Sequence, residues 1–126
     1  MGSLIESHCI FPVQDLMLTA YFYEQKLGFN IVPYLDAKEP HVCLYRDGTE
    51  LILTKTNGQK VIPNRELYGY GYDAYFITNN QEELEIEFRE AEVKIVRKLE
   101  GTDYGNKEFV IEDIDGRWIA FGIKTK

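Results

Sequence analysis

The sequence predicts an α+β fold of two tandem βαβββ modules that form an incomplete barrel around a cleft. Each half of the 126-residue chain holds one helix-like stretch, with one strand-like run before it and three after it. The Asp-Gly pair at 47–48 recurs at 115–116, about half the chain later. We therefore expect a single domain over residues 1–126, with repeats at about 6–56 and 70–124.

The first module is expected to contain one amphipathic helix within residues 14–29. Asp15 can accept a hydrogen bond from the free N–H groups of the first turn, and Gly28 suits the left-handed conformation that ends a helix. The buried stripe recurs at helical spacing and comprises Leu16, Ala20, Tyr23 and Leu27. Strand-like runs lie at 8–13, 29–35, 41–46 and 46–56, with the Asp-Gly turn between the last two.

The second module repeats this order. Its helix is expected within residues 79–93, where Asn80 and Glu83 have the spacing of a capping box. The buried stripe comprises Leu84, Phe88 and Ala91, and strand-like runs lie at 72–78, 93–99, 107–113 and 114–124. We expect residues 57–69 to be a loop that joins the modules.

Composition and charge exclude several classes of protein. The net charge of −7 disfavours nucleic acids and anionic membranes, because both require a basic protein face. No run approaches the roughly 18 apolar residues of a membrane helix, and the N-terminal residues do not resemble a secretory signal. We expect a cytoplasmic protein with no nucleic-acid or membrane partner, whose cysteines, Cys9 and Cys43, are reduced.

Motifs for nucleophilic catalysis are scarce. The chain has no Gly-x-Ser-x-Gly elbow, P-loop or dinucleotide fingerprint. His41 and Cys43 share a strand face if that strand is regular, so His41 could lower the pKa of the thiol. The simpler interpretation is that they are unrelated residues at strand positions, and we expect no catalytic residues.

Three segments carry a family resemblance. They are VQDLMLTAYFYEQKLGFNIV, RDGTELIL and YGNKEFVIEDIDGRWIAFG, and together they span almost the whole chain. In this order they resemble the vicinal oxygen chelate superfamily, which includes glyoxalase I, extradiol dioxygenases, fosfomycin-resistance enzymes and bleomycin-resistance proteins. The bleomycin-resistance type is the most similar. The resemblance implies a homodimer with two clefts at its interface, in which the modules pair either within a chain or across the dimer.

The resemblance also identifies four positions where metal enzymes of the superfamily carry His, Gln or Glu ligands. These positions hold His8, Ile52, Tyr72 and Ala120, and only His8 is a competent ligand. Glu50 lies one pleat from Ile52 on the same strand face. We therefore expect no metal and no other cofactor. The alternative is one divalent ion held by His8, Glu50 and a residue of the partner subunit.

Strand alternation predicts which side chains face the cleft. The parity that includes His8 selects Glu50 and Ile52 from the fourth strand. In the fifth strand the same alternation predicts that Tyr72, Ala74 and Phe76 share the cleft-facing side. We expect Phe76 to be a core residue that packs beneath Tyr72. The expected ligand-binding residues are His8, Glu50, Ile52, Tyr72, Trp118 and Ala120.

A cleft lined by rings and aliphatic side chains suits a flat organic molecule, and the rings of Tyr72 and Trp118 could also hold a cation. We expect a bleomycin-resistance-like protein that gives antibiotic resistance by sequestering a small aromatic or cationic ligand. One alternative is a metal-dependent glyoxalase-type lyase or dioxygenase with a degenerate site that includes His8 and Glu50. Another is a dimeric scaffold whose cleft has no ligand.

Overall fold

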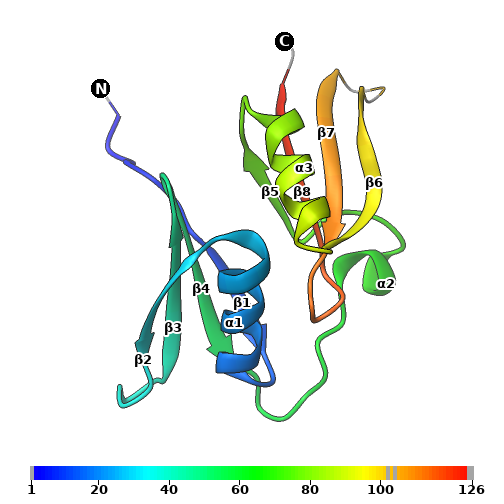
Figure 1. Ribbon diagram of the computed structural model, residues 1–126. Coiled ribbons are helices and arrows are strands. Elements are labelled where there is room, and N and C mark those ends of the chain that lie inside the picture. Colours follow the sequence, from blue (N-terminus) through cyan, green and yellow to red (C-terminus); the bar gives the residue numbers. More distant parts are fainter. Residues whose placement is uncertain (1, 102, 104, 125–126) are drawn as a thin grey trace. The chain divides into compact units, whose positions relative to one another are not determined.

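The computed structural model describes residues 2–101, 103 and 105–124. The chain divides into two compact units, residues 1–60 and 61–126, and each unit contains one four-stranded sheet and one long helix (Figure 1). The predicted order βαβββ is therefore present twice, which confirms the α+β class.

The first unit is the simpler of the two. Its sheet has the order β1-β4-β3-β2, in which β1 runs parallel to β4 and the other neighbours are antiparallel. Its elements are β1 (Cys9–Val13), α1 (Leu16–Leu27), β2 (Asn30–Tyr34), β3 (His41–Arg46) and β4 (Thr49–Lys55).

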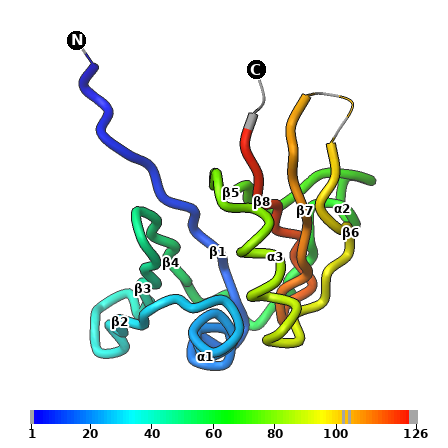
Figure 2. Tube along the Cα trace, turned by 45° about the horizontal axis from the view of Figure 1, so that its top comes forward, coloured from blue at the N-terminus to red at the C-terminus, as the bar shows by residue number. Residues whose placement is uncertain are grey.

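Helix α1 begins and ends as its sequence predicts. The Asp15 carboxylate accepts a hydrogen bond of 3.1 Å from the backbone N–H of Leu18, and Gly28 has a φ of 76° at the C-terminal end. The predicted stripe is buried and comprises Leu16, Ala20, Tyr23 and Leu27. In Figure 2, where α1 is seen nearly end-on, the helix lies beside the strands of its own unit.

The two faces of the first sheet differ in burial. Alternate residues of β1, β3 and β4 are buried with α1 and form the core, and they are Phe11, Val13, Val42, Leu44, Leu51 and Leu53. The opposite face carries Ile10, Cys43, Tyr45 and Ile52, of which Ile10 is 59% exposed.

The second unit has the same sheet plan with one added helix. The sheet order is β5-β8-β7-β6, with β5 parallel to β8. Its elements are α2 (Asn64–Tyr68), β5 (Ala74–Ile77), α3 (Gln81–Glu90), β6 (Lys94–Gly101), β7 (Asn106–Glu112) and β8 (Trp118–Lys124). The short helix α2 lies in the segment that was expected to be a loop.

Helix α3 packs through phenylalanine rings. Phe88 is 1% exposed, and its ring centre lies 6.0 Å from that of Phe109 and 5.2 Å from that of Phe121. Phe76 adds a fourth ring, 5.4 Å from Phe121. Asn80 precedes the helix as predicted, but its side chain makes no capping hydrogen bond.

The fifth strand corrects one prediction. Ala74 and Phe76 are buried on the α3 side of the sheet, and Tyr75 is the residue that pairs with Ala120 on the opposite face. The strand begins at Ala74, so counting alternate residues from Tyr72 passes through irregular backbone and selects the wrong face.

None of the helices in the described part of the chain is long and apolar enough to cross a membrane.

Candidate functional site

The six residues predicted to bind a ligand are divided between the two units. His8, Glu50 and Ile52 belong to the first unit, and Tyr72, Trp118 and Ala120 belong to the second. Tyr72 and Trp118 line a pocket, whereas Ala120 is completely buried in β8 and does not line it. The second unit therefore holds the better-defined candidate site.

His8 and Glu50 lie close together in the first unit. His8 immediately precedes β1, and the register that pairs Cys9 with Leu51 places the two side chains side by side. The Nδ1 atom of His8 lies 3.1 Å from Oε1 of Glu50, and Nε2 lies 3.1 Å from Oε2 of Glu6.

Glu6, His8 and Glu50 form a donor set that could hold a divalent ion, since one ligand atom of each lies within 4.8 Å of the others. An imidazole nitrogen and two carboxylates suit a first-row transition metal. Glu6 was not predicted, because it lies in the extended arm before β1. Its side chain is 65% exposed, so this cluster is open to solvent.

Cys43 and His41 do not form a reactive pair. His41 places Nδ1 2.8 Å from the Glu39 carbonyl oxygen and stacks on the Tyr34 ring. Burial raises the pKa of the Cys43 thiol, which favours the unreactive protonated form at neutral pH. The possible activation of this thiol by His41 is therefore not supported.

The pocket of the second unit has a volume of about 800 Å³, within the range typical of small-molecule sites. Its walls come from the connector with α2, from the middle of β6, from the start of β7, and from one residue each of β5 and β8. The lining residues are Arg65, Glu66, Gly69, Tyr70, Gly71, Tyr72, Tyr75, Arg97, Asn106 and Trp118.

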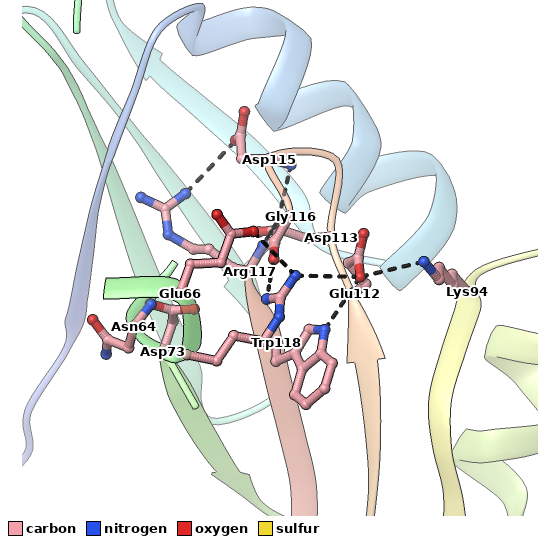
Figure 3. A network of polar contacts seen from close by, with 11 residues as sticks. Asn64, Glu66, Asp73, Lys94, Glu112, Asp113, Asp115, Gly116, Arg117 and Trp118 are labelled. Atoms are coloured by element: carbon pink, nitrogen blue, oxygen red, sulfur yellow. Dashed lines mark hydrogen bonds and ion pairs between the residues drawn. The ribbon is translucent and has the colours of Figure 1, made fainter. Parts of the chain in front are cut away.

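Trp118 forms the aromatic centre of one wall. Its indole N–H donates a hydrogen bond of 3.1 Å to Glu112, and the Arg65 guanidinium lies 4.4 Å above its ring centre. Lys94 lies 3.4 Å from the same carboxylate, so Lys94 and Trp118 both reach Glu112 (Figure 3). Arg65 also lies 3.7 Å from Glu112 and donates a hydrogen bond to the Gly116 carbonyl.

The second wall is a hydrogen-bonded network around a buried carboxylate. Glu108 is 0% exposed, and it accepts hydrogen bonds of 2.7 Å from the Tyr72 hydroxyl and 2.8 Å from the Tyr75 hydroxyl. Arg97 donates to the Tyr72 oxygen at 2.6 Å, and Asn106 donates to the Tyr75 oxygen at 3.1 Å. These partners satisfy the buried acid and orient both rings.

A glycine leaves room for this network. A Cβ atom at Gly122 would lie 2.6 Å from Cβ of Glu108, 2.6 Å from the Tyr75 hydroxyl and 2.7 Å from the Lys107 carbonyl oxygen. Only a residue without a side chain fits opposite Glu108 at this point of β8.

Local hydrogen bonds tie α2 to the strand that follows it. The backbone N–H of Asn64 donates to the Asp73 carboxylate at 3.1 Å, and the Asn64 amide donates to the Tyr72 carbonyl at 3.2 Å. Gly69 and Gly71 have φ values of 91° and 107°, which let the chain fold back between these points. Tyr72 is thus held beside the sheet and does not belong to the regular strand.

Tyr75 remains protonated over a wide pH range. Burial and the hydrogen bond to the Glu108 carboxylate raise the pKa of Tyr75 to about 12. The hydroxyl therefore acts as a hydrogen-bond donor at neutral pH, and an acid–base role there is disfavoured.

Sequence analysis did not identify Arg65, Tyr75, Arg97, Asn106 or Glu108 as site residues. Counting alternate residues from Tyr72 places Tyr75 on the opposite face of the strand, although β5 begins only at Ala74. Arg65 lies in the short helix α2, within a segment whose sequence predicts a loop. Glu108 had no distinct signal in the sequence, because β7 also contains the polar residues Asn106, Lys107 and Glu112.

The chain matches known proteins in fold. A family model described as the Glyoxalase/Bleomycin resistance protein/Dioxygenase superfamily matches residues 7–121. Among solved structures, UcmS2 has a TM-score of 0.73 and 19% identity, over 96% of this chain and 98% of that chain. A superfamily member from Sphaerobacter thermophilus DSM 20745 has a TM-score of 0.73 and 22% identity, over 96% and 98% of the two chains.

TioX from Micromonospora sp. ML1 is also similar, with a TM-score of 0.66 and 15% identity over 94% of this chain and 98% of that chain. The curated proteins contain no significant match. At these identities the likeness to the solved structures concerns the fold alone.

Proposed function

The chain belongs to the glyoxalase/bleomycin resistance protein/dioxygenase superfamily, and from this premise we propose that it binds and sequesters a small aromatic molecule. The pocket of the second unit is the observation that carries the proposal. Its volume of about 800 Å³ and its rings suit a flat organic ligand held by stacking and burial of apolar surface.

The chemistry of the pocket supports binding rather than catalysis. The described lining contains no His, Cys, Ser or Thr side chain that could act as a nucleophile. The hydroxyls of Tyr72 and Tyr75 are hydrogen-bonded to the buried Glu108. The polar atoms of these two rings are thus already engaged in the wall of the pocket.

A thermal-shift screen of aromatic compounds tests the proposal. A ligand that binds only the folded protein should add about 2.7 kcal/mol of stability at 100 times its Kd. Trp118→Ala should remove most of this gain, with each variant compared with its own ligand-free state. Tyr21→Ala is a matched control, because Tyr21 is an exposed ring on α1 outside the pocket. If no aromatic compound stabilises the wild type, the result contradicts the proposal and favours the alternative of a scaffold without a ligand.

We further propose that the protein gives antibiotic resistance by sequestering the drug, with one drug molecule bound in the pocket of each chain. Bacteria that express the wild-type chain should tolerate several-fold more of a stabilising aromatic drug than bacteria that express Trp118→Ala at equal protein level. Equal tolerance in the two strains would remove the resistance role and leave ligand binding intact.

A metal site is the second candidate, and the geometry of Glu6, His8 and Glu50 favours it. A divalent ion there would supply Lewis-acid chemistry, and the three side chains would hold it. Elemental analysis of the purified protein after metal loading should find a stoichiometric ion that His8→Ala loses. His41→Ala is the matched control, since His41 is the other histidine of the chain. Equal metal content in both variants would exclude His8 as a ligand.

A further inference from the structure

The carboxylates around the pocket are engaged by neighbouring groups. Glu66 is the one carboxylate in the described lining, and it lies 3.7 Å from Arg65 with 61% of its side chain exposed. Glu108 is 0% exposed and lies behind the two tyrosine rings that it binds. Glu112 is reached by Trp118, Lys94 and Arg65. Among the described lining residues, the charged hydrogen-bond donors are the guanidinium groups of Arg65 and Arg97.

Arg97 is the cation that is not neutralised. Its side chain makes one hydrogen bond within the described chain, to the Tyr72 hydroxyl oxygen at 2.6 Å, and forms no ion pair with a described carboxylate. A guanidinium has five N–H donors, so most of those on Arg97 are available to a ligand. Its central carbon lies 5.5 Å from the Tyr72 ring centre and 6.0 Å from the Trp118 ring centre, which places the charge between two stacking surfaces.

Arg65 provides an internal comparison. It also lies over Trp118, but it lies 3.7 Å from both Glu66 and Glu112 and donates to the Gly116 carbonyl. Its charge is balanced within the wall, whereas the charge of Arg97 is not. The two arginines therefore have different roles, and Arg97 is the one that suits a charged ligand group.

We propose that the pocket takes a small aromatic acid, whose ring stacks against Trp118 and whose carboxylate pairs with Arg97. This inference rests on the proposed function and adds the charge class of the ligand. A guanidinium matches a carboxylate with two parallel N–H···O bonds, which gives both strength and orientation.

The net charge of −7 does not oppose this assignment. Charges on the distant surface are screened beyond about 8 Å at physiological ionic strength. A carboxylate in direct contact with Arg97 is screened far less, so the local cation decides the preference.

Three probes that share one ring test the proposal: 2-naphthoate, 2-naphthamide and 2-naphthylmethylammonium. Calorimetric titration of the full chain gives each affinity. Trp118 is the single tryptophan, so its indole N–H signal in an NMR spectrum reports binding at the pocket. We expect the naphthoate to bind roughly tenfold or more tightly than the neutral amide, because a charge-assisted hydrogen bond increases affinity by about this factor.

Arg97→Gln should remove this preference and leave binding of the amide within a few-fold of wild type. Lys98→Gln is the matched control, because it removes the same charge from the neighbouring exposed residue of β6, outside the pocket. The indole signal of each variant verifies that the pocket is folded. A naphthoate preference that survives Arg97→Gln would overturn the assignment to Arg97.

The wild-type titrations separate this inference from the proposed function. If none of the three probes moves the indole signal, the pocket does not bind aromatic molecules and both proposals fail. If the amide or the ammonium probe binds as well as the naphthoate, the anionic preference is wrong and aromatic binding stands.

Discussion

Single residues determine whether the pocket wall can form. Glu108 is a fully buried carboxylate that the protein tolerates because two tyrosine hydroxyls bind it. Gly122 makes space for this arrangement across the sheet. The stability of the second unit should therefore be sensitive to small changes at these positions.

Gly122→Ala should destabilise the protein by about 1–3 kcal/mol, the usual cost of overpacking. The new Cβ would meet the Lys107 carbonyl oxygen at 2.7 Å, and backbone cannot move aside as a flexible side chain can. Urea unfolding followed by Trp118 fluorescence measures the change. Gly48→Ala is the control, because nothing lies within 4 Å of a Cβ there. Equal effects of the two substitutions would show that Gly122 is not specially constrained.

Tyr75→Phe should cost about 1–3 kcal/mol at neutral pH, because the buried Glu108 loses one of its donors. The substitution should also change the response to alkali. The folded-state pKa of Tyr75 is raised to about 12, against about 10 in the unfolded chain. Its contribution is complete below pH 10 and is lost as the pH rises towards 12.

The unfolding free energy of the wild type should therefore fall more steeply between pH 10 and 12 than that of Tyr75→Phe. Urea unfolding at intervals across this range measures both slopes. Parallel curves for the two proteins would mean that the Tyr75 hydroxyl is not held in its protonated form.

At the scale of the element, helix ends differ in how well local sequence defines them. The Asp15 cap and the Gly28 stop of α1 both have the predicted geometry, because each depends only on residues of one turn. Asn80 occupies the corresponding place before α3, yet its side chain makes no capping bond. The backbone N–H of Asn80 donates a hydrogen bond of 3.0 Å to the Thr78 hydroxyl oxygen, so a different contact holds this turn.

Asp15→Ala should destabilise the protein by about 1 kcal/mol, since it removes the acceptor for the Leu18 N–H. Asn80→Ala should change stability by less than about 0.5 kcal/mol, because no side-chain cap is lost. Thermal and urea unfolding of the two variants provide the comparison. An Asn80→Ala cost as large as that of Asp15→Ala would contradict the assignment of the caps.

The elements that sequence analysis missed depend on contacts between segments. Helix α2 has only five residues, too few for a helical period, and it is held by the bonds from Asn64 to Tyr72 and Asp73. The same bonds hold Tyr72 and Asp73 outside the regular strand. Counting alternate residues from Tyr72 therefore predicts that Ala74 faces the pocket, whereas Tyr75 does. Both regular helices and all eight strands could be predicted, because each follows a simple period or turn signal.

At the scale of the whole molecule, two units with the same sheet plan carry different chemistry. The first has the exposed His8 cluster, and the second has the aromatic pocket. Repetition in the sequence was enough to predict the shared plan. It could not predict the difference, because Arg97 and Glu108 acquire their roles only through the partners that the fold places beside them.

We propose that the chain forms a homodimer through the sheet face of the first unit that lies opposite α1. Ile10, Tyr34 and Tyr45 expose 59%, 46% and 37% of their surfaces there, and exposed apolar patches favour association. Light scattering after size exclusion should give about twice the monomer mass of 14.7 kDa.

Ile10→Lys should shift the dimer towards monomer, since a charge would be buried in the interface. Leu18→Lys is the control, because Leu18 is 55% exposed on α1, away from this face. A monomer at all concentrations, or equal behaviour of both variants, would contradict this interface.

Half of the residues that line the pocket precede Tyr72, in the connector that carries α2. The connector carries the helix α2, and its side chains at Leu67, Tyr68 and Tyr70 are exposed. Substitutions of these three exposed side chains remove no buried residue, so ligand preference can diverge without a matching loss of folding. Changes in the connector therefore provide a route by which proteins with this same fold can recognise different molecules, in evolution or by design.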